Sequence, residues 1–271
     1  MAVQQSACYA KYSSLRSLEK QGGQASAMRQ KRIPLRVATY NVHKCRGLDG
    51  RTDVRRIAAV LKSLKADVIA LQEVIGPGAK KMGQDEELAM RLNMTPLLAP
   101  ARLYRGHPYG NVLLSRLPVT NHVTCDLSQK GLEERICQCI DLEVDGHTVQ
   151  LHNVHFGTSK NERVRQAKKL IEFVLFPQTR RPKIILGDFN EWMKGPATEL
   201  LSGQLKSLDL IPHLKWRRTY PGIFPMLHLD HLYYTGHIEI RSFQVSRRWP
   251  ALIASDHLPM VADIRVMVKE R

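Results

Sequence analysis

Short apolar runs, each followed by polar side chains, recur along the chain from Leu35 onward. The runs and their polar followers are Leu35–Tyr40 with Asn41, Asp67–Leu71 with Gln72 and Glu73, Val112–Leu114 with Ser115 and Arg116, Val149–Val154 with His155, and Lys183–Leu186 with Gly187, Asp188 and Asn190. Their length and their content of Val, Ile and Leu predict buried β-strands. Alternating or β-branched stretches predict further strands over Ile136–Val144, Thr148–Val154, Leu229–Tyr234, Ile238–Val245 and Met260–Val268, with a tight turn at Asp145–Gly146.

Three segments carry apolar residues at helical spacing instead. In the first, Thr52 or Asp53 can cap a helix whose apolar stripe runs from Val54 to Leu64. The other two lie near Gln84–Leu92 and Asn161–Leu175. Strands outnumber helices and no linker divides the chain, so residues 34–271 are predicted to form one α/β domain with mixed sheets and outer helices.

Residues 1–33 differ from the rest of the chain. They are rich in Gln, Ser, Ala, Lys and Arg, and they predict a flexible basic extension with a short helix over Ser13–Lys20. The sequence contains neither an apolar run long enough to span a membrane nor the apolar core of a secretory signal. We therefore expect a cytoplasmic protein.

Charge and cysteine content narrow the possible partners. The net charge of +16 and the pI near 9.9 favour an anionic partner, either nucleic acid, acidic lipid headgroups or a phosphorylated small molecule, although a generally basic surface explains the charge equally well. No protein partner is predicted. The five cysteines have no CxxC spacing, so we expect buried thiols, and a zinc site would need more ligands.

Candidate chemistry collects where the predicted strands end, which is where polar site residues gather in α/β proteins. The residues there are Asn41, Glu73, His155, Asp188, Asn190, Asp230, Asp256 and His257. Carboxylates, amides and imidazoles without a thiolate suit a hard cation such as Mg²⁺ or Mn²⁺.

These residues lie in a series of motifs with a fixed order. The motifs are Thr39–His43 (TYNVH), Leu71–Val74 (LQEV), Gly110–Ser115 (GNVLLS), Asn153–His155 (NVH), Gly187–Asn190 (GDFN), Leu229–His231 (LDH) and Ser255–Pro259 (SDHLP). The series resembles the endonuclease/exonuclease/phosphatase (DNase I-like) superfamily, in particular its compact, stand-alone bacterial members. The resemblance covers about residues 35–268. It implies a four-layered α/β/β/α sandwich of two mixed β-sheets with outer helices, and metal-dependent hydrolysis of phosphate esters.

The resemblance also implies roles for individual residues. Glu73, with Asn41 and Asp256, resembles the set that binds the metal. Asp188 resembles the residue that aligns and deprotonates the attacking water. Asn190, two positions on, is expected on the same side of a strand-like segment, where it holds that water or a phosphate oxygen.

Two histidines complete the implied catalytic set. His257 resembles a phosphate-binding imidazole that is oriented by Asp230, and His155 resembles a second phosphate-binding group or a general acid. Tyr109 is a further catalytic candidate by resemblance. Asn111 and Arg135 are substrate-binding candidates, although Arg135 follows two glutamates and an ion pair at the surface is the alternative. Whether His43 and Lys44 line the cleft stays open.

The superfamily defines a reaction rather than a substrate. A nucleic-acid phosphodiester is the first expectation, and a phospholipid, a sphingolipid or a small phosphoester is the alternative. The apolar segment Tyr220–Leu227 and Trp192 are candidates for contact with a lipid or a base, and simple packing is the other explanation for both. A catalytically inactive module that binds a phosphorylated ligand would lack one of the expected groups, and all of them are present.

Overall fold

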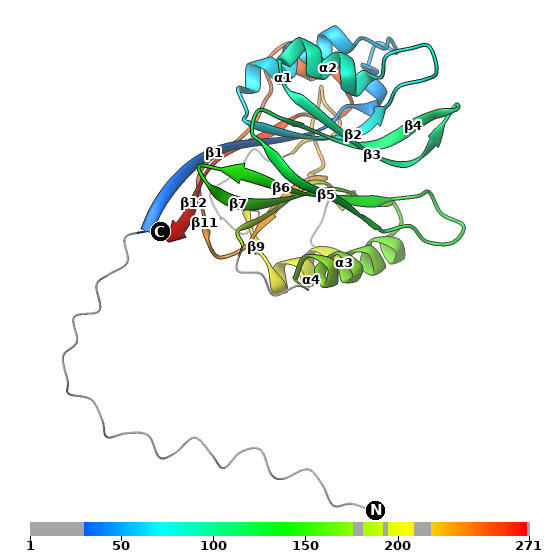
Figure 1. The fold of residues 1–271 in the computed structure, drawn as a ribbon. Helices are drawn as coiled ribbons and strands as arrows, with labels where there is room; N and C mark the ends of the chain where they lie inside the picture. The colour runs from blue at the N-terminus through cyan, green and yellow to red at the C-terminus, as the bar shows by residue number, and fades with distance from the viewer. Residues whose placement is uncertain (1–29, 176–180, 192–194, 209–217, 270–271) are drawn as a thin grey trace, which may run out of the picture.

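The computed structural model describes residues 30–175, 181–191, 195–208 and 218–269. In it, two six-stranded mixed sheets pack face to face, and helices cover both outer faces (Figure 1). The predicted four-layered sandwich is therefore confirmed. The expected helix over Ser13–Lys20, Cys8 and Trp192 lie outside the described residues.

The two sheets are each built from strands that are distant in sequence. The first contains, in spatial order, β11 (Ile238–Val245), β12 (Met260–Lys269), β1 (Gln30–Asn41), β2 (Val68–Ile75), β4 (His107–Ser115) and β3 (Thr95–Tyr104). The second contains β5 (Val119–Asp126), β6 (Ile136–Val144), β7 (His147–His155), β8 (Lys183–Asp188), β10 (Asp230–Tyr234) and β9 (Lys206–Ser207). The pairs β1–β2 and β7–β8 are parallel, so each pair brings two carboxyl ends together.

The helices divide between the two outer layers. Helices α1 (Val54–Leu64) and α2 (Gln84–Leu92) cover the first sheet, and α3 (Lys160–Leu175) and α4 (Pro196–Gln204) cover the second (Figure 1). The short helices η1 (His43–Cys45) and α5 (Ala251–Ala254) lie in connections. Three apolar clusters fill the spaces between the four layers, with the middle cluster between the sheets. Among the described residues, no helix is long and apolar enough to cross a membrane.

Local sequence signals account for most of these elements. Asp53 caps α1, because its carboxylate accepts hydrogen bonds from the backbone N–H groups of Arg55 and Arg56. Asp145 and Gly146 both have positive φ and form the turn between β6 and β7, as predicted. The sequence did not predict β3, β5 or α4.

The start of the domain needs a correction. Strand β1 begins at Gln30, and Ile33 is buried between the sheets. Pro34 pairs with Arg265 of β12 rather than marking the first residue of the fold. The boundary expected at residue 34 is therefore four residues too late, because the basic residues that precede Pro34 belong to a paired strand.

A network of buried amides fixes one sheet against the other beneath the strand ends. The Asn153 side chain on β7 donates to the carbonyls of Leu71 on β2 and Val112 on β4, each at 3.1 Å. Gln72 on β2 donates to Asn153 Oδ1 at 2.8 Å. Since buried amides are costly unless fully paired, this network holds β2 and β7 in one relative position. Glu73 follows Gln72 on β2, and His155 lies two residues after Asn153 on β7, so the network also fixes where these two residues lie relative to each other.

The cysteines of the described residues are free thiols. Cys45, Cys137 and Cys139 are buried and Cys125 is half-buried, which confirms the expectation of buried thiols for three of them. Burial raises the pKa of the Cys139 thiol to about 12. These groups therefore remain protonated and unreactive at neutral pH.

Candidate active site

A cavity of about 440 Å³ opens where β1, β2 and β8 end. The predicted site residues that line it are Asn41, Glu73, Tyr109, Arg135, His155, Asp188, Asn190, Asp256 and His257. Asp230 lies behind His257 and is fully buried. The structure thus brings together all but one of the residues that the sequence analysis selected, from eight separate stretches of the chain.

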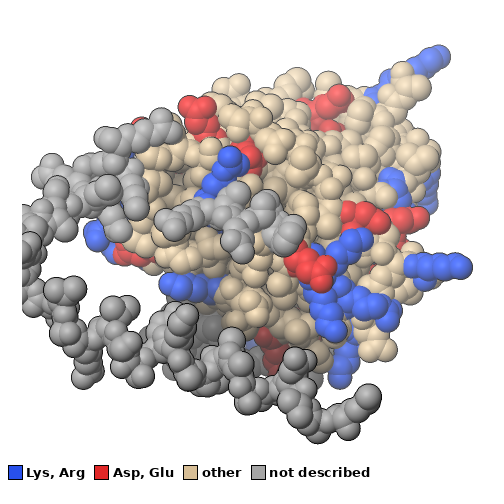
Figure 2. All heavy atoms as spheres, turned by 60° about the horizontal axis from the view of Figure 1, so that its bottom comes forward, with Lys and Arg blue, Asp and Glu red and all other residues tan. Residues whose placement is uncertain are grey.

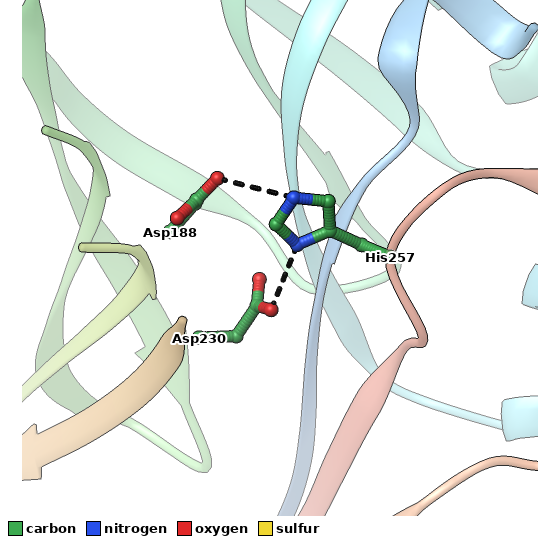
Figure 3. A group of neighbouring side chains, drawn as sticks. All are labelled: Asp188, Asp230 and His257. Atoms are coloured by element: carbon green, nitrogen blue, oxygen red, sulfur yellow. Dashed lines mark hydrogen bonds and ion pairs between the residues drawn. The ribbon is translucent and has the colours of Figure 1, made fainter. Parts of the chain in front are cut away.

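At the centre of the site, the His257 ring lies between two carboxylates (Figure 3). Its Nδ1 is 2.9 Å from Asp230 Oδ2, and its Nε2 is 3.6 Å from Asp188 Oδ2. Asp188 and Asp230 are register partners on the antiparallel strands β8 and β10, so the sheet itself fixes the spacing of the two acids. The ring is consequently held in one orientation, with Nε2 facing Asp188.

The charges of this trio follow from burial and from one another. Burial alone would lower the pKa of His257, but Asp230 and Asp188 outweigh it and raise that pKa from 6.5 to about 10. Burial raises the pKa of Asp188, against the opposing effect of His257. At neutral pH the site therefore contains a protonated imidazole beside a carboxylate of increased basicity.

Asn41 connects the carboxylates of the two sheets. Its side-chain NH₂ donates to Asp188 Oδ2 at 2.9 Å and to Glu73 Oε1 at 3.2 Å. The backbone N–H of His43 donates to the Asn41 amide oxygen at 3.0 Å, which fixes the direction of the amide. The Asn41 oxygen accepts this one hydrogen bond and keeps a second lone pair, so its role as a metal ligand stays a prediction. In the structure Asn41 positions two carboxylates.

Glu73 is placed by an irregularity in β2. The β2–β4 register shifts between Leu71 and Val74, and Glu73 has a φ of 61°. A glutamate in the left-handed region is strained, and strain of this kind concentrates at functional sites. The bulge turns the Glu73 side chain into the cavity, where Lys44 Nζ lies 2.7 Å from its Oε2. Tyr109 also donates a hydrogen bond to Glu73.

The turn after β1 supplies one basic partner for each of the acids Glu73 and Asp256. His43 and Lys44 in η1 have φ values of 44° and 59°. Lys44 lines the cavity, and His43 Nδ1 lies 3.2 Å from Asp256 Oδ1. Burial would raise the pKa of Glu73, but His155 and Lys44 hold it well below its usual range. The question that the sequence left open is answered: both residues contact the acidic groups of the site.

His155 and Arg135 form another wall of the cavity. His155 Nε2 lies 3.7 Å from Asp188 Oδ2, and burial together with Arg135 lowers the pKa of His155. Arg135 is buried, donates to the carbonyl of Phe156 at 3.3 Å and pairs with Glu133 at 2.8 Å. Arg135 therefore has the ion pair that was the alternative, yet it also faces the cavity.

Asn190 lines the cavity, but from a turn after β8 rather than from the strand-like segment that was expected. Strand β8 ends at Asp188, and Asn190 has a φ of 51°, so the two side chains do not share one side of a strand. The Asn190 N–H donates to Asp188 Oδ1 at 2.9 Å, and its side-chain NH₂ donates to the Phe156 carbonyl at 2.8 Å. Asn190 thus fixes the loop that carries Asp188, as an Asx turn does.

Asn111 is the one predicted site residue that does not reach the cavity. Its side-chain NH₂ donates to the carbonyls of Asn153 at 3.0 Å and Ile136 at 3.4 Å. It is buried between the sheets as part of the amide network. The expected substrate-binding role is therefore not supported, because strand β4 points this side chain toward the other sheet.

Several lining residues were not predicted. Arg102 and Glu133 face the cavity from β3 and from the loop before β6, together with Thr158 and Leu229. Tyr220 and Leu227 also line the cavity, and they are the two ends of the segment that the sequence offered for contact with a lipid or a base. Arg102 stacks over the Tyr109 ring at 4.6 Å and pairs with Glu133 at 2.5 Å. Because β3 was not predicted as a strand, nothing in the sequence pattern placed Arg102 beside Tyr109.

The donor atoms of the cavity fit a hard divalent cation. Glu73 and Asp256 present carboxylate oxygens that are partly accessible, and each lies beside one basic side chain, Lys44 or His43. Asp188, Asp230 and His257 offer a second group of ligand atoms within 4.8 Å of one another. Glu73 and Asp256 are the residues that would hold such a cation, because the other group is buried and already paired internally.

Comparison with known proteins agrees with this arrangement. The model of the Endonuclease/Exonuclease/phosphatase family matches residues 38–257, so the chain belongs to that family. The uncharacterized protein YbhP of Escherichia coli K12 is 27% identical over 246 residues, which cover 85% of this chain and 96% of YbhP.

Solved structures show the same fold. An endonuclease/exonuclease/phosphatase from Beutenbergia cavernae has 26% identity and a TM-score of 0.67, with 87% of this chain and 72% of that chain covered. The human Nocturnin catalytic domain with a bound sulfate anion has 19% identity and a TM-score of 0.69, with 87% and 96% covered. Family and site together support hydrolysis of a phosphoester.

Proposed function

We propose that the chain is a metal-dependent phosphodiesterase that uses water as its nucleophile. The observation that carries this proposal is the arrangement of His257 between Asp230 and Asp188, with Glu73 and Asp256 in the lining of the same cavity. One group of residues is built to activate water and stabilise negative charge. The other is built to hold a cation, with Mg²⁺ or Mn²⁺ as the expected metal.

Asp188 aligns the attacking water and accepts its proton. Its raised pKa suits this role, because a stronger base accepts a proton more readily at neutral pH. Asn190 and Asn41 hold the Asp188 carboxylate through one bond each, so the base is fixed before substrate binds. Positioning of this kind removes much of the entropic barrier to attack.

The two histidines stabilise the phosphate. His257 is protonated and held by Asp230, so it donates a charged hydrogen bond to a phosphoryl oxygen. His155 has a lowered pKa and is neutral, which favours phosphate binding over proton donation. Arg135 adds a permanent positive charge to the same wall. A divalent cation, when bound, acts as a Lewis acid that neutralises phosphate charge.

Two anionic substrates fit the net charge of +16 equally well. A nucleic acid is the expectation from the sequence, and a phospholipid is the second candidate. On the face that Figure 2 presents, several Lys and Arg side chains gather in a group beside acidic ones, and others lie apart from it. The exposed apolar side chains of Ile223, Phe224 and Met226, next to the cavity-lining residue Leu227, favour the phospholipid.

The first experiment is hydrolysis of bis-p-nitrophenyl phosphate with Mg²⁺, with Mn²⁺ and with EDTA. We expect metal-dependent turnover in the wild type and none in His257→Ala or Glu73→Ala. Met90→Ser, an exposed position on α2, is the control and retains activity. Turnover that survives EDTA, or that survives in both variants, rules out the proposed mechanism.

A further inference from the structure

A short loop lines the cavity with both of its ends and exposes an apolar tip. Tyr220 and Leu227 pair with each other across the loop, and both line the cavity. Between them, Ile223, Phe224 and Met226 are 49%, 74% and 66% exposed. Three large apolar side chains that project together from one loop are unusual on a protein surface and typically mark a contact site.

The base of this loop is fixed to the catalytic segment. The Gly222 N–H donates to the carbonyl of Asp256 at 2.8 Å, and the Leu258 N–H donates to the carbonyl of Thr219 at 2.8 Å. The ring of Tyr220 lies 5.1 Å from the ring of His257. The loop tip, and any surface that it contacts, is therefore held at a fixed position relative to the imidazole of His257.

A second exposed aromatic residue comes from the neighbouring segment. Trp249 is 72% exposed and lies two residues before α5. The loop contacts α5 directly, since a Cβ added at Gly222 would lie 3.1 Å from the carbonyl of Leu252. We call Ile223, Phe224, Met226 and Trp249 the apolar rim.

The two segments that form the apolar rim also carry arginines, and neither segment contributes an acid of its own. Arg218 and Arg248 are exposed, and Arg247 donates to the carbonyl of Arg218 at 3.4 Å, which connects the two segments. Neither residues 218–229 nor residues 241–255 contain an aspartate or glutamate. Exposed apolar side chains bordered by arginines match the interface of an anionic bilayer, where acyl chains lie beneath phosphate headgroups.

We propose that the apolar rim docks the enzyme on an anionic phospholipid bilayer and presents a lipid phosphodiester to the cavity. The assignment of a lipid substrate rests on the proposed function, whereas the docking does not. Attack by water forms one P–O bond and breaks another, and the proton that Asp188 accepts is returned to the leaving alcohol. A phosphate monoester and an alcohol result, so water is the sole co-reactant.

The test measures sedimentation of the full chain with vesicles of phosphatidylcholine, with and without phosphatidylglycerol. We expect binding to the anionic vesicles and a loss of about tenfold or more in affinity for Phe224→Ser and for Met226→Ser. Met90→Ser is the matched control, because Met90 is a methionine with 65% exposure on α2, and its binding stays unchanged. Arg248→Gln weakens binding to the anionic vesicles about fivefold.

Activity measurements separate this inference from the proposed function. Phe224→Ser and Met226→Ser hydrolyse bis-p-nitrophenyl phosphate like the wild type but lose turnover of phosphatidylglycerol in vesicles. Vesicle binding that is equal in wild type, Phe224→Ser and Met90→Ser overturns the docking surface. The docking surface is also overturned if the protein does not bind vesicles but binds DNA in a salt-sensitive way that these substitutions weaken. Absence of any phosphodiester hydrolysis refutes the proposed function and leaves the docking result standing.

Discussion

The Asp230–His257 pair gives the sharpest test of how the site works. Asp230 is fully buried, and its carboxylate is 2.9 Å from His257 Nδ1. The substitution Asp230→Asn keeps the shape and removes the charge. Two effects are expected: the His257 ring loses its preference for the protonated form, and the orientation of its Nε2 toward the phosphate is no longer enforced.

The structure sets the size of the effect. The pKa of His257 rises from 6.5 to about 10 because of neighbouring carboxylates. At about 1.4 kcal/mol for each pKa unit, their combined net effect is about 5 kcal/mol. Asp230 is the largest of these influences and makes the direct hydrogen bond, so we assign it about 2–3 kcal/mol of this. A loss of that size in the transition state lowers kcat by about thirtyfold to two-hundredfold.

Two measurements check this prediction. The kcat for bis-p-nitrophenyl phosphate is compared between wild type, Asp230→Asn and Asp145→Asn, a control that removes an exposed carboxylate paired with Lys31. The titration of His257 is followed by NMR, where the pKa in Asp230→Asn is expected to fall toward its ordinary value. Activity within twofold of the wild type refutes the reasoning. A large loss of activity with an unchanged His257 titration also refutes it, because Asp230 would then act by another route.

Three further predictions concern the metal, pH and the amide network. Lys44→Gln removes the charge 2.7 Å from Glu73 and tightens Mn²⁺ binding, as measured by calorimetry. The gain is about fivefold and no more, because the Lys44–Glu73 pair is partly exposed. Weaker binding would mean that Lys44 positions Glu73 for the metal. Because the pKa of His257 is raised in the fold, protonated His257 contributes its full stabilisation below pH 6.5. The free energy of unfolding, measured in urea, therefore falls as pH rises through about 10. The same fall in His257→Gln would exclude His257 as its source. Asn111→Ala lowers the free energy of unfolding by about 1–3 kcal/mol with kcat and KM unchanged, and a large rise in KM would restore its substrate-binding role.

Most of the strands that the sequence predicted lie within their sheets; the edge strand β11 was predicted as well, from its alternating pattern. Strands β6, β8 and β10 lie within their sheet and read as continuous or alternating apolar stretches. Strands β3 and β5 are edges, and they were missed for a physical reason. β3 contains two prolines, and β5 exposes most of its side chains, so both resemble loops in sequence. The omission of β3 is also why Arg102 was missed.

The site was predicted to the extent that its residues end buried strands. What the sequence could not show is the backbone conformation at those ends. Glu73 and Asn190 both have positive φ, which nothing in the residues around them indicates. Asn111 fitted its motif, yet the direction of its side chain depends on which face of the sheet it occupies. The motifs thus predicted where the site lies, whereas the conformation of the backbone at bulges and turns determines which side chains reach the cavity.

Charge pairing explains how a cavity with so many acids is stable when it folds. Burying an unpaired carboxylate costs several kcal/mol or more. Glu73 is paired with Lys44, Asp256 with His43, and Asp230 with His257. Two of these partners, Lys44 and His43, come from the three-residue helix η1, which begins two residues after Asn41 at the end of β1. One turn of the chain therefore supplies a basic partner for both acids. A divalent cation that binds Glu73 or Asp256 must compete with these side chains, which ties metal affinity to the conformation of that turn.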